Sequence, residues 1–585
     1  MHKVLKFLKP YKGAVIASLF LSLFNYAMQL ILPALMSAMI NTGIAQGRLS
    51  FVKITGILMA LLSFIAVLAA ISGSYYSSKA AACFGLSLRR AVFKKVENLN
   101  KCDIDEIGVP SLITRTTNDI RQIQDMLLLV IRIIIAAPIM MVGGAFMAFA
   151  LNRRLSIIIF TMLPIIVIIA AVVSKIVIPM FSKVQKKTDR LNLILREKLN
   201  GIKVIRAFNR SEYEDEKFSF ANNQLTGLLL KINRLFAGLI PLVTFLAFTI
   251  VSALIWTGAK QIDSLDATLN HAQIANIVGD LQAFMVYMIM IVFAVSLAAS
   301  LLVMLPKANI SAKRINEVLN IVPSIKEPEH PVIPDESRKS ELEFQNVSFS
   351  YPNADSPILR KISFKASKGE TTAVIGSTGS GKSTLVNLIP RFYDVSGGKI
   401  LIDGTDIRHM STKTLHEKIG FIPQSAFLFS GTIADNLRMG KADATESEMW
   451  EALEIAQAKD FVEALPDKLN SVLSQNGKNL SGGQRQRLAI ARVVIRKAEI
   501  YVFDDSFSAL DFTTDMKLRK ALKEHMKDIS KVIVAQRIGT IIDADRIIVL
   551  DEGKIAGIGT HKELLESCTV YREIAQSQLS KEDLQ

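Results

Sequence analysis

Residues 371–384 read Thr-Thr-Ala-Val-Ile-Gly-Ser-Thr-Gly-Ser-Gly-Lys-Ser-Thr, and this stretch decides the fold of the second half of the chain. A short β-rich run enters a glycine loop, and a helix-compatible stretch follows, which is the setting that a P-loop requires. Glycines let backbone N–H groups turn toward phosphates, and the helix N-terminus adds its positive end. We therefore predict an α/β P-loop domain that binds a nucleotide.

The loop assigns a role to each kind of residue in it. Lys382 is expected to contact the β- and γ-phosphates, and Ser383 is expected to bind Mg²⁺. The predicted phosphate-binding residues are Gly376, Ser377, Thr378, Gly379, Ser380, Gly381, Lys382, Ser383 and Thr384.

A second strand, Ile500-Tyr-Val-Phe-Asp504, ends in a carboxylate. Buried strands often end in this way, so the pattern alone is weak. Following a P-loop at this distance, Asp504 is the expected Walker-B residue that holds magnesium through water.

Between these two motifs the chain reads Asn479-Leu-Ser-Gly-Gly-Gln-Arg-Gln-Arg487. Ser481, Gly482 and Gly483 open a helix, and their N–H groups form an anion site, although a plain capped helix start has the same pattern. With Gln484 they resemble the signature motif of ABC ATPase domains. The resemblance extends over the whole chain, to the exporter branch in which a membrane domain and the ATPase domain are fused.

The resemblance implies further site residues. Tyr351 matches the aromatic residue that stacks on adenine, and Gln424 matches the Q-loop glutamine that touches magnesium and the membrane-domain interface. The implied magnesium ligands are Ser383, Gln424 and Asp504, and the implied cofactors are ATP and Mg²⁺. Residues 508–511 match the D-loop.

Two positions depart from the family pattern. Asp505 follows the Walker-B residue where the family has Glu, and its carboxylate is one methylene shorter, which spoils the alignment of the attacking water. Gln536 stands in place of the switch histidine, and glutamine carries neither a proton nor a positive charge. The alternative for Asp505 is a conservative replacement that still works slowly.

ABC ATPase domains pair head to tail, so each nucleotide lies between one chain's P-loop and the other's signature. Because the signature here is intact while the P-loop site is altered, we expect a heterodimer with a second exporter half-chain that carries Glu and His. A slow homodimer is the alternative.

The first half of the chain is strongly apolar. Six segments reach the roughly 20 apolar residues that a membrane helix needs, near 14–40, 54–78, 128–151, 155–181, 235–258 and 274–305. Basic residues cluster before the first and in the long connections after the second and fourth, which places these regions and the N-terminus in the cytosol. The first span is expected to be a retained anchor.

The predicted fold is a membrane bundle of six transmembrane helices with long cytosolic extensions, plus the α/β P-loop ATPase domain. The expected divisions are residues 1–322 for the membrane domain, 323–340 for a linker and 341–585 for the ATPase domain. In the family, short crosswise helices at the tips of the inner loops transmit motion, and by position these fall near 102–111 and 209–218.

The net charge of +16 belongs to basic cytosolic loops, because no nucleic-acid module is present and no nucleic-acid partner is expected. The three cysteines show no metal or disulfide spacing. The predicted function is ATP-driven export of hydrophobic small molecules, drugs or lipids, by a multi-pass protein of the cell membrane. An ATP-gated channel and a sensor module without net transport are the alternatives.

Overall fold

The computed structural model describes residues 2–263, 271–352, 354 and 356–579, without the side chains of scattered residues in 162–185, 236–243 and 299–303 or of residues 2, 271, 272 and 336. The chain forms two compact units. One comprises Met1–Asn98 with Ile107–Val322, and the other comprises Leu99–Glu106 with Pro323–Gln585. This division differs from the expected domains, because Leu99–Glu106 groups with the ATPase domain and the expected linker does so too.

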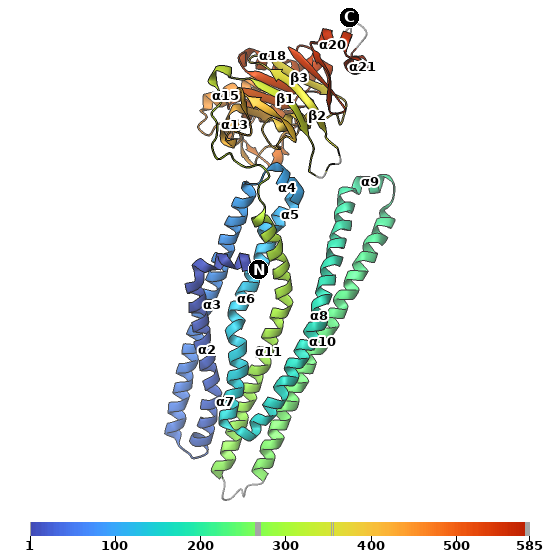
Figure 1. Ribbon diagram of the computed structural model, residues 1–585. Helices are drawn as coiled ribbons and strands as arrows, with labels where there is room; N and C mark the ends of the chain where they lie inside the picture. The colour runs from blue at the N-terminus through green and yellow to red at the C-terminus, as the bar shows by residue number, and fades with distance from the viewer. Residues whose placement is uncertain (1, 264–270, 353, 355, 580–585) are drawn as a thin grey trace. The chain divides into compact units, whose positions relative to one another are not determined.

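The described part of the first unit consists of helices and short connections, as a bilayer core requires, since a helix satisfies its own backbone hydrogen bonds. Its α-helices are α1 (His2–Leu5), α2 (Lys12–Ala38), α3 (Leu49–Glu97), α5 (Val109–Thr114), α6 (Ile120–Pro138), α7 (Gly144–Leu151), α8 (Arg153–Asn200), α9 (Ile202–Ala207), α10 (Ser211–Asp263) and α11 (His271–Asn320). Within this unit, α8 and α10 run side by side and are joined at α9 (Figure 1).

Five helical segments in the described residues are long and apolar enough to cross a membrane: Lys3–Ile44, Leu49–Glu97, Val109–Leu151, Thr244–Asp263 and Gln273–Ala298. Each overlaps one of the spans expected from the sequence. The span expected at 155–181 falls within α8, where several residues lie outside the described part.

Hydrogen bonds connect α2 to α3 and α11 within this apolar bundle. The Ser18 hydroxyl donates to the Gly73 carbonyl of α3 at 2.9 Å. The Tyr287 hydroxyl of α11 donates to the Leu30 carbonyl at 2.8 Å, and the Ser37 hydroxyl donates to the Asp280 carboxylate of α11 at 3.0 Å. Asp280 therefore packs against α2, as membrane-embedded ionisable residues pair within a bundle.

The turn between α8 and α10 corrects one expectation. We expected a short crosswise helix near 209–218, but the structure has it at α9, and α10 already begins at Ser211. The acidic run 212–216 continues the helical period of α10, so it forms the helix start and not a separate tip. The first tip is α4 (Lys101–Ile107), close to where it was expected, and Gly108 with φ +82° follows it.

The second unit is built on two sheets. The larger has the strand order β12-β11-β3-β10-β9-β6, in which only β12 is antiparallel to its neighbour, and the smaller is the antiparallel sheet β2-β1-β4-β5. Their bounds are β1 (Leu342–Phe349), β2 (Leu359–Ala366), β3 (Thr371–Gly376), β4 (Gly397–Ile402), β5 (Thr405–Asp406), β6 (Ile419–Ile422), β9 (Ile500–Asp504), β10 (Ser530–Val534), β11 (Arg546–Asp551) and β12 (Lys554–Gly559). Since ligands bind beyond the carboxyl ends of parallel strands, the ends of β3, β9 and β10 mark the site.

Helices cover the larger sheet and complete the second unit. Its helices and remaining short strands are α4, α12 (Lys382–Leu388), α13 (Thr412–Lys418), β7 (Gly431–Thr432), α14 (Ile433–Arg438), α15 (Glu446–Ile455), α16 (Lys459–Glu463), β8 (Val472–Leu473), α17 (Gly482–Val494), α18 (Phe512–His525), α19 (Ile538–Ile541), α20 (His561–Ser567) and α21 (Thr569–Gln578). One buried core includes Tyr501, Phe503 and Ile533 on one face of the sheet, and a second includes Val502, Val532 and Ile548. Successive side chains of β9 enter the two cores alternately, as in a strand that is buried on both faces.

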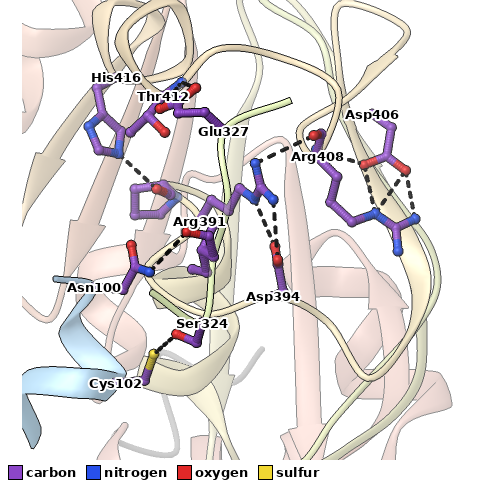
Figure 2. Close-up of polar contacts among 12 residues, drawn as sticks. Asn100, Cys102, Ser324, Glu327, Arg391, Asp394, Asp406, Arg408, Thr412 and His416 are labelled. Carbon is purple, nitrogen blue, oxygen red and sulfur yellow. Dashed lines mark hydrogen bonds and ion pairs between the residues drawn. The ribbon is translucent and has the colours of Figure 1, made fainter. Parts of the chain in front are cut away.

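Figure 2 shows how α4 and residues 324–327 are held in this unit. The Cys102 thiol and the Ser324 hydroxyl lie 2.7 Å apart, and the Asn100 amide donates to the Ile325 carbonyl at 3.2 Å. Glu327 accepts from the Thr412 backbone N–H at the start of α13. Hydrogen bonds therefore hold the start of the expected linker against the ATPase domain.

Candidate nucleotide-binding site

The glycine loop joins the end of β3 to the start of α12. A Cβ atom at Gly376 would lie 2.1 Å from the Leu550 carbonyl oxygen, so only glycine fits there. Gly379 and Gly381 have φ angles of +85° and +100°, a region that favours glycine. The sequence therefore folds here into a loop whose backbone N–H groups can face a bound anion.

The side chains of the loop suit a phosphate. The Lys382 ammonium donates to the Gly376 and Ser377 carbonyls at 2.8 and 2.7 Å, which folds it over the loop. Burial lowers the pKa of Lys382, while Asp505 and Asp504 act in the opposite direction. Within the described part of the chain, the buried Ser380 hydroxyl has no hydrogen-bond partner, as expected for a donor that awaits a ligand oxygen.

Ser383 and Asp504 meet below this loop. The Ser383 hydroxyl donates to the Asp504 carboxylate at 3.1 Å, and burial raises the pKa of that carboxyl. No cluster of three or more His, Cys, Asp or Glu side chains that could hold a metal exists in the described residues. This oxygen pair fits Mg²⁺, which protein carboxylates hold together with water and nucleotide phosphates.

The two departures from the family pattern are bonded to each other. Asp505 follows β9 with φ +48°, a left-handed conformation that is rare outside glycine. Its Oδ2 atom accepts from the Gln536 amide at 2.8 Å and from the Gln424 amide at 3.2 Å. Burial raises the pKa of Asp505. The structure thus brings Gln424, Asp505 and Gln536 together at the carboxyl ends of β6, β9 and β10.

An aromatic cluster adjoins the loop helix. The Tyr351 hydroxyl is hydrogen-bonded to the Thr384 hydroxyl at 3.2 Å, and the Tyr351 ring packs edge-on against Tyr393 with centroids 5.2 Å apart. Tyr393 is buried and donates its hydroxyl to the Asp105 carboxylate of α4 at 3.0 Å. Burial, followed by the Asp105 bond, raises the pKa of Tyr393.

Sequence reasoning missed Tyr393 and Asp105. The available signal was an aromatic residue in the run Arg391-Phe-Tyr-Asp394 that follows the loop helix. A lone aromatic residue is more often core than site, and its partner in α4 is separated by almost three hundred residues of sequence.

The signature residues begin α17. The Ser481 hydroxyl accepts from the Gln484 backbone N–H at 3.2 Å, and the Gln484 side chain accepts from the Ser481 backbone N–H at 2.9 Å. This capping box leaves the first turn of α17 well formed. A Cβ atom at Gly482 would meet nothing within 4 Å, whereas one at Gly483 would lie 3.5 Å from the Ala509 carbonyl of the D-loop. Among the described contacts, none joins these residues to the P-loop of the same chain.

Comparisons with known proteins identify the family of this chain. The family model of the ABC transporter transmembrane region matches residues 15–295, and the ABC transporter model matches residues 359–508. An uncharacterized ABC transporter ATP-binding protein of Mycobacterium tuberculosis is 40% identical over 574 residues, covering 98% of this chain and 97% of that protein. The chain belongs to the ABC transporter family. A lipid A-core flippase of Syntrophus aciditrophicus, described as ATP-dependent, is 32% identical over 497 residues, which cover 85% of this chain and 80% of the flippase.

This ABC transporter also has the fold of a solved exporter. A bacterial Atm1-family ABC exporter with ATP bound matches with a TM-score of 0.80 and 23% sequence identity, covering 97% of this chain and 99% of that chain. The chain thus has the fold of an ABC exporter, with fused transmembrane and ATP-binding domains, and as an ABC transporter it is an ATPase coupled to transport. ABC ATPase domains bind ATP, in general with Mg²⁺.

In this ABC transporter, the Tyr393 hydroxyl is expected to anchor α4 to the ATPase domain. We predict that Tyr393→Phe speeds amide hydrogen exchange across Lys101–Ile107 about tenfold, because it removes a hydrogen bond to a charged group worth roughly 1.5–3 kcal/mol. Asp105→Asn should act in the same direction. Hydrogen–deuterium exchange with mass spectrometry measures both variants.

Tyr571→Phe is the matched control, because it removes a buried hydroxyl that bonds His561 far from α4 in sequence. Exchange in Lys101–Ile107 should be unchanged in that control. Equal protection in Tyr393→Phe and the wild type would show that the hydroxyl does not hold α4.

Proposed function

We propose that this chain is one half of a heterodimeric ABC exporter that moves hydrophobic small molecules, drugs or lipids, out of the cell across the cell membrane. Its own P-loop site binds ATP and hydrolyses it poorly, and its signature completes the hydrolytic site of a second half-chain. The N-terminus and the ATPase domain lie in the cytoplasm. The lipid A-core flippase among the relatives supports an amphiphilic cargo.

One observation carries the proposal: the Oδ2 atom of Asp505 accepts from both Gln424 and Gln536. A general base must reach the attacking water within about 2.6–3.2 Å. Asp505 carries a short side chain, and its carboxylate is tied to two amides. Gln536 cannot share a proton with that carboxylate as an imidazole could. The P-loop nevertheless keeps every feature that binding requires.

The capped start of α17 supports the second half of the proposal. Ser481, Gly482 and Gly483 present a helix N-terminus whose N–H groups suit a γ-phosphate. This helix N-terminus serves a nucleotide bound by a second chain, so its presence favours a dimer. Because the signature is intact while the P-loop site of the same chain is altered, a heterodimer is favoured over a homodimer. Phe429 and Met439, 46% and 58% exposed, border a groove of about 330 Å³ on the second unit, and exposed apolar surfaces of this kind mark interfaces.

The sixth expected span is rich in methionine and phenylalanine, which suits an adaptable apolar cargo cavity, and these side chains differ in exposure. Phe284, Met288 and Met290 of α11 are buried in helix packing, whereas Phe293 is 56% exposed. The packed methionines can still adapt to different cargoes if the helices part, because their side chains are flexible. Lipid contact is the simpler role for Phe293.

The experiment compares the two hydrolytic positions within one assembly. This chain is coexpressed with the half-exporter chain encoded beside it, and ATP-dependent efflux is measured from vesicles. We expect Asp505→Asn to keep at least about half of the transport rate, because its site contributes little hydrolysis. Substituting the partner's catalytic glutamate with glutamine should reduce transport by about a hundredfold or more.

Other results would select the alternatives. Full transport by this chain alone, abolished by Asp505→Asn, would establish a homodimer and reject the proposal. Ion conductance that persists while ATP remains unhydrolysed would establish a gated channel. An assembly that hydrolyses ATP in response to drugs or peptides but moves none of them would establish a sensor.

A further inference from the structure

A cavity of about 400 Å³ lies between α18 and α19, over the strands β9 and β10. The described site does not use it. Its apolar lining includes Phe503, Leu522, Ile533, Ile541, Ile542 and Ala544. This volume and this lining are typical of sites for small organic ligands, which bind in pockets of roughly 300–1,000 Å³ with few polar groups.

The polar groups of this cavity are mainly cationic. Lys520 and Lys523 are exposed on α18, and neither forms an ion pair or hydrogen bond within the part of the chain that the structure describes. Arg519 differs, because it pairs with Asp515 at 3.2 Å. Asp543 is the acidic residue of the lining. The lining of the cavity therefore carries more positive than negative charge.

Lys531 adds a third cation, from the sheet side. It is 4% exposed, and its ammonium donates to the Met526 and Ile529 carbonyls at 2.9 and 3.1 Å. An ammonium has three donors, so one remains for a further acceptor. Burial and the charge of Lys523 lower the pKa of Lys531, against the opposing effect of Asp545. A buried ammonium in this setting is stabilised by an anion.

We propose that this cavity is a binding site for a small organic carboxylate with an apolar body, whose carboxylate lies among Lys520, Lys523 and Lys531 and whose body fills the space between α18 and α19. Charge complementarity selects the anion, and the apolar lining selects the body.

The position of the cavity gives such a ligand access to the nucleotide chemistry. The helix α18 begins directly after the D-loop residue Asp511, whose side chain caps it, and α19 begins two residues after Gln536. A ligand bound between α18 and α19 therefore contacts the helix that follows the D-loop and the helix that follows Gln536. The site does not depend on the heterodimer proposed above, because each chain carries it whole.

The test measures binding of 2-naphthoate to the full chain in nanodiscs of zwitterionic lipid, without nucleotide, by isothermal titration calorimetry. Empty nanodiscs give the background of partitioning into lipid. We expect one saturable site per chain, with no saturable binding of the neutral analogue 2-naphthylmethanol. Lys520→Gln and Lys523→Gln should each weaken binding about fivefold or more, because each removes a charge-assisted contact.

Two further variants make the result decisive. Lys517→Gln removes an exposed charge on the same helix outside the lining, and its affinity should equal that of the wild type. Gly539→Phe should abolish binding, because Gly539 lines the cavity and a Cβ there meets no atom within 4 Å, so the ring can occupy the space. Retained ATP binding confirms that each variant is folded. No saturable binding to the wild type, or equal binding to Gly539→Phe, would overturn the proposal.

Discussion

Lys382→Ala is expected to lower the affinity for ATP with Mg²⁺ by at least about a hundredfold. The Lys382 ammonium lies over the glycine loop and is held there by two loop carbonyls. A phosphate that replaces those carbonyls gains charge-assisted hydrogen bonds worth roughly 1.5–3 kcal/mol each, and alanine removes them together with the positive charge. Equilibrium titration with a fluorescent ATP analogue measures the change.

Two controls separate charge from loop structure. Lys399→Ala removes an exposed lysine of β4 outside the loop and should bind ATP like the wild type. Lys382→Arg keeps the charge but changes its geometry, so its affinity should lie between those of the alanine variant and the wild type. Unchanged affinity in Lys382→Ala would remove the nucleotide assignment on which the proposed function depends.

The double substitution of Asp505→Glu with Gln536→His is expected to raise ATP hydrolysis by this chain's own site about 10- to 100-fold. The longer carboxylate reaches the position of an attacking water, and a histidine supplies a proton and a charge that Gln536 lacks. General-base catalysis is typically worth 10²- to 10⁴-fold, so partial recovery already gives a large signal. Phosphate release from this chain, paired with a partner whose catalytic glutamate is changed to glutamine, isolates the site.

The single substitutions test whether the two positions act as a unit. Asp505 and Gln536 are in direct contact, so their effects should not be additive. Asp505→Glu also places a longer side chain at φ +48°, and a thermal unfolding curve shows whether the strand end tolerates it. Wild-type hydrolysis already as fast as that of the double variant would contradict the impaired-site interpretation.

Local sequence was sufficient for the P-loop because glycine determines the backbone there. Gly376, Gly379 and Gly381 specify a loop that other residues could not form, and the strand and helix on either side follow from their hydrophobic patterns. The helix start at the signature was predictable for the same reason, because the capping box joins Ser481 and Gln484, which are three residues apart. These motifs lie within single stretches of chain, so the sequence contains all of their interactions.

The apolar spans were also predictable, but the connection that carries α9 was not. The length and hydropathy of a membrane helix are set by the bilayer, which each segment meets independently. The acidic run 212–216 has helical periodicity whether it forms a separate crosswise helix or the start of α10. Local sequence therefore does not show where one helix ends and the next begins. The structure puts the turn ahead of Ser211.

The sequence alone determined five of the six expected apolar spans, the glycine loop, the capped signature helix and the two altered residues, because each depends on composition, period or backbone freedom within a few turns of chain. Only the tertiary structure decided that Asp505 is bonded to Gln424 and Gln536, that Tyr393 reaches Asp105, and that α4 belongs with the ATPase domain. It alone also enclosed the cavity beside Lys531. These features join segments far apart in the chain, and packing of buried strands and helices sets their distances, which no local pattern encodes.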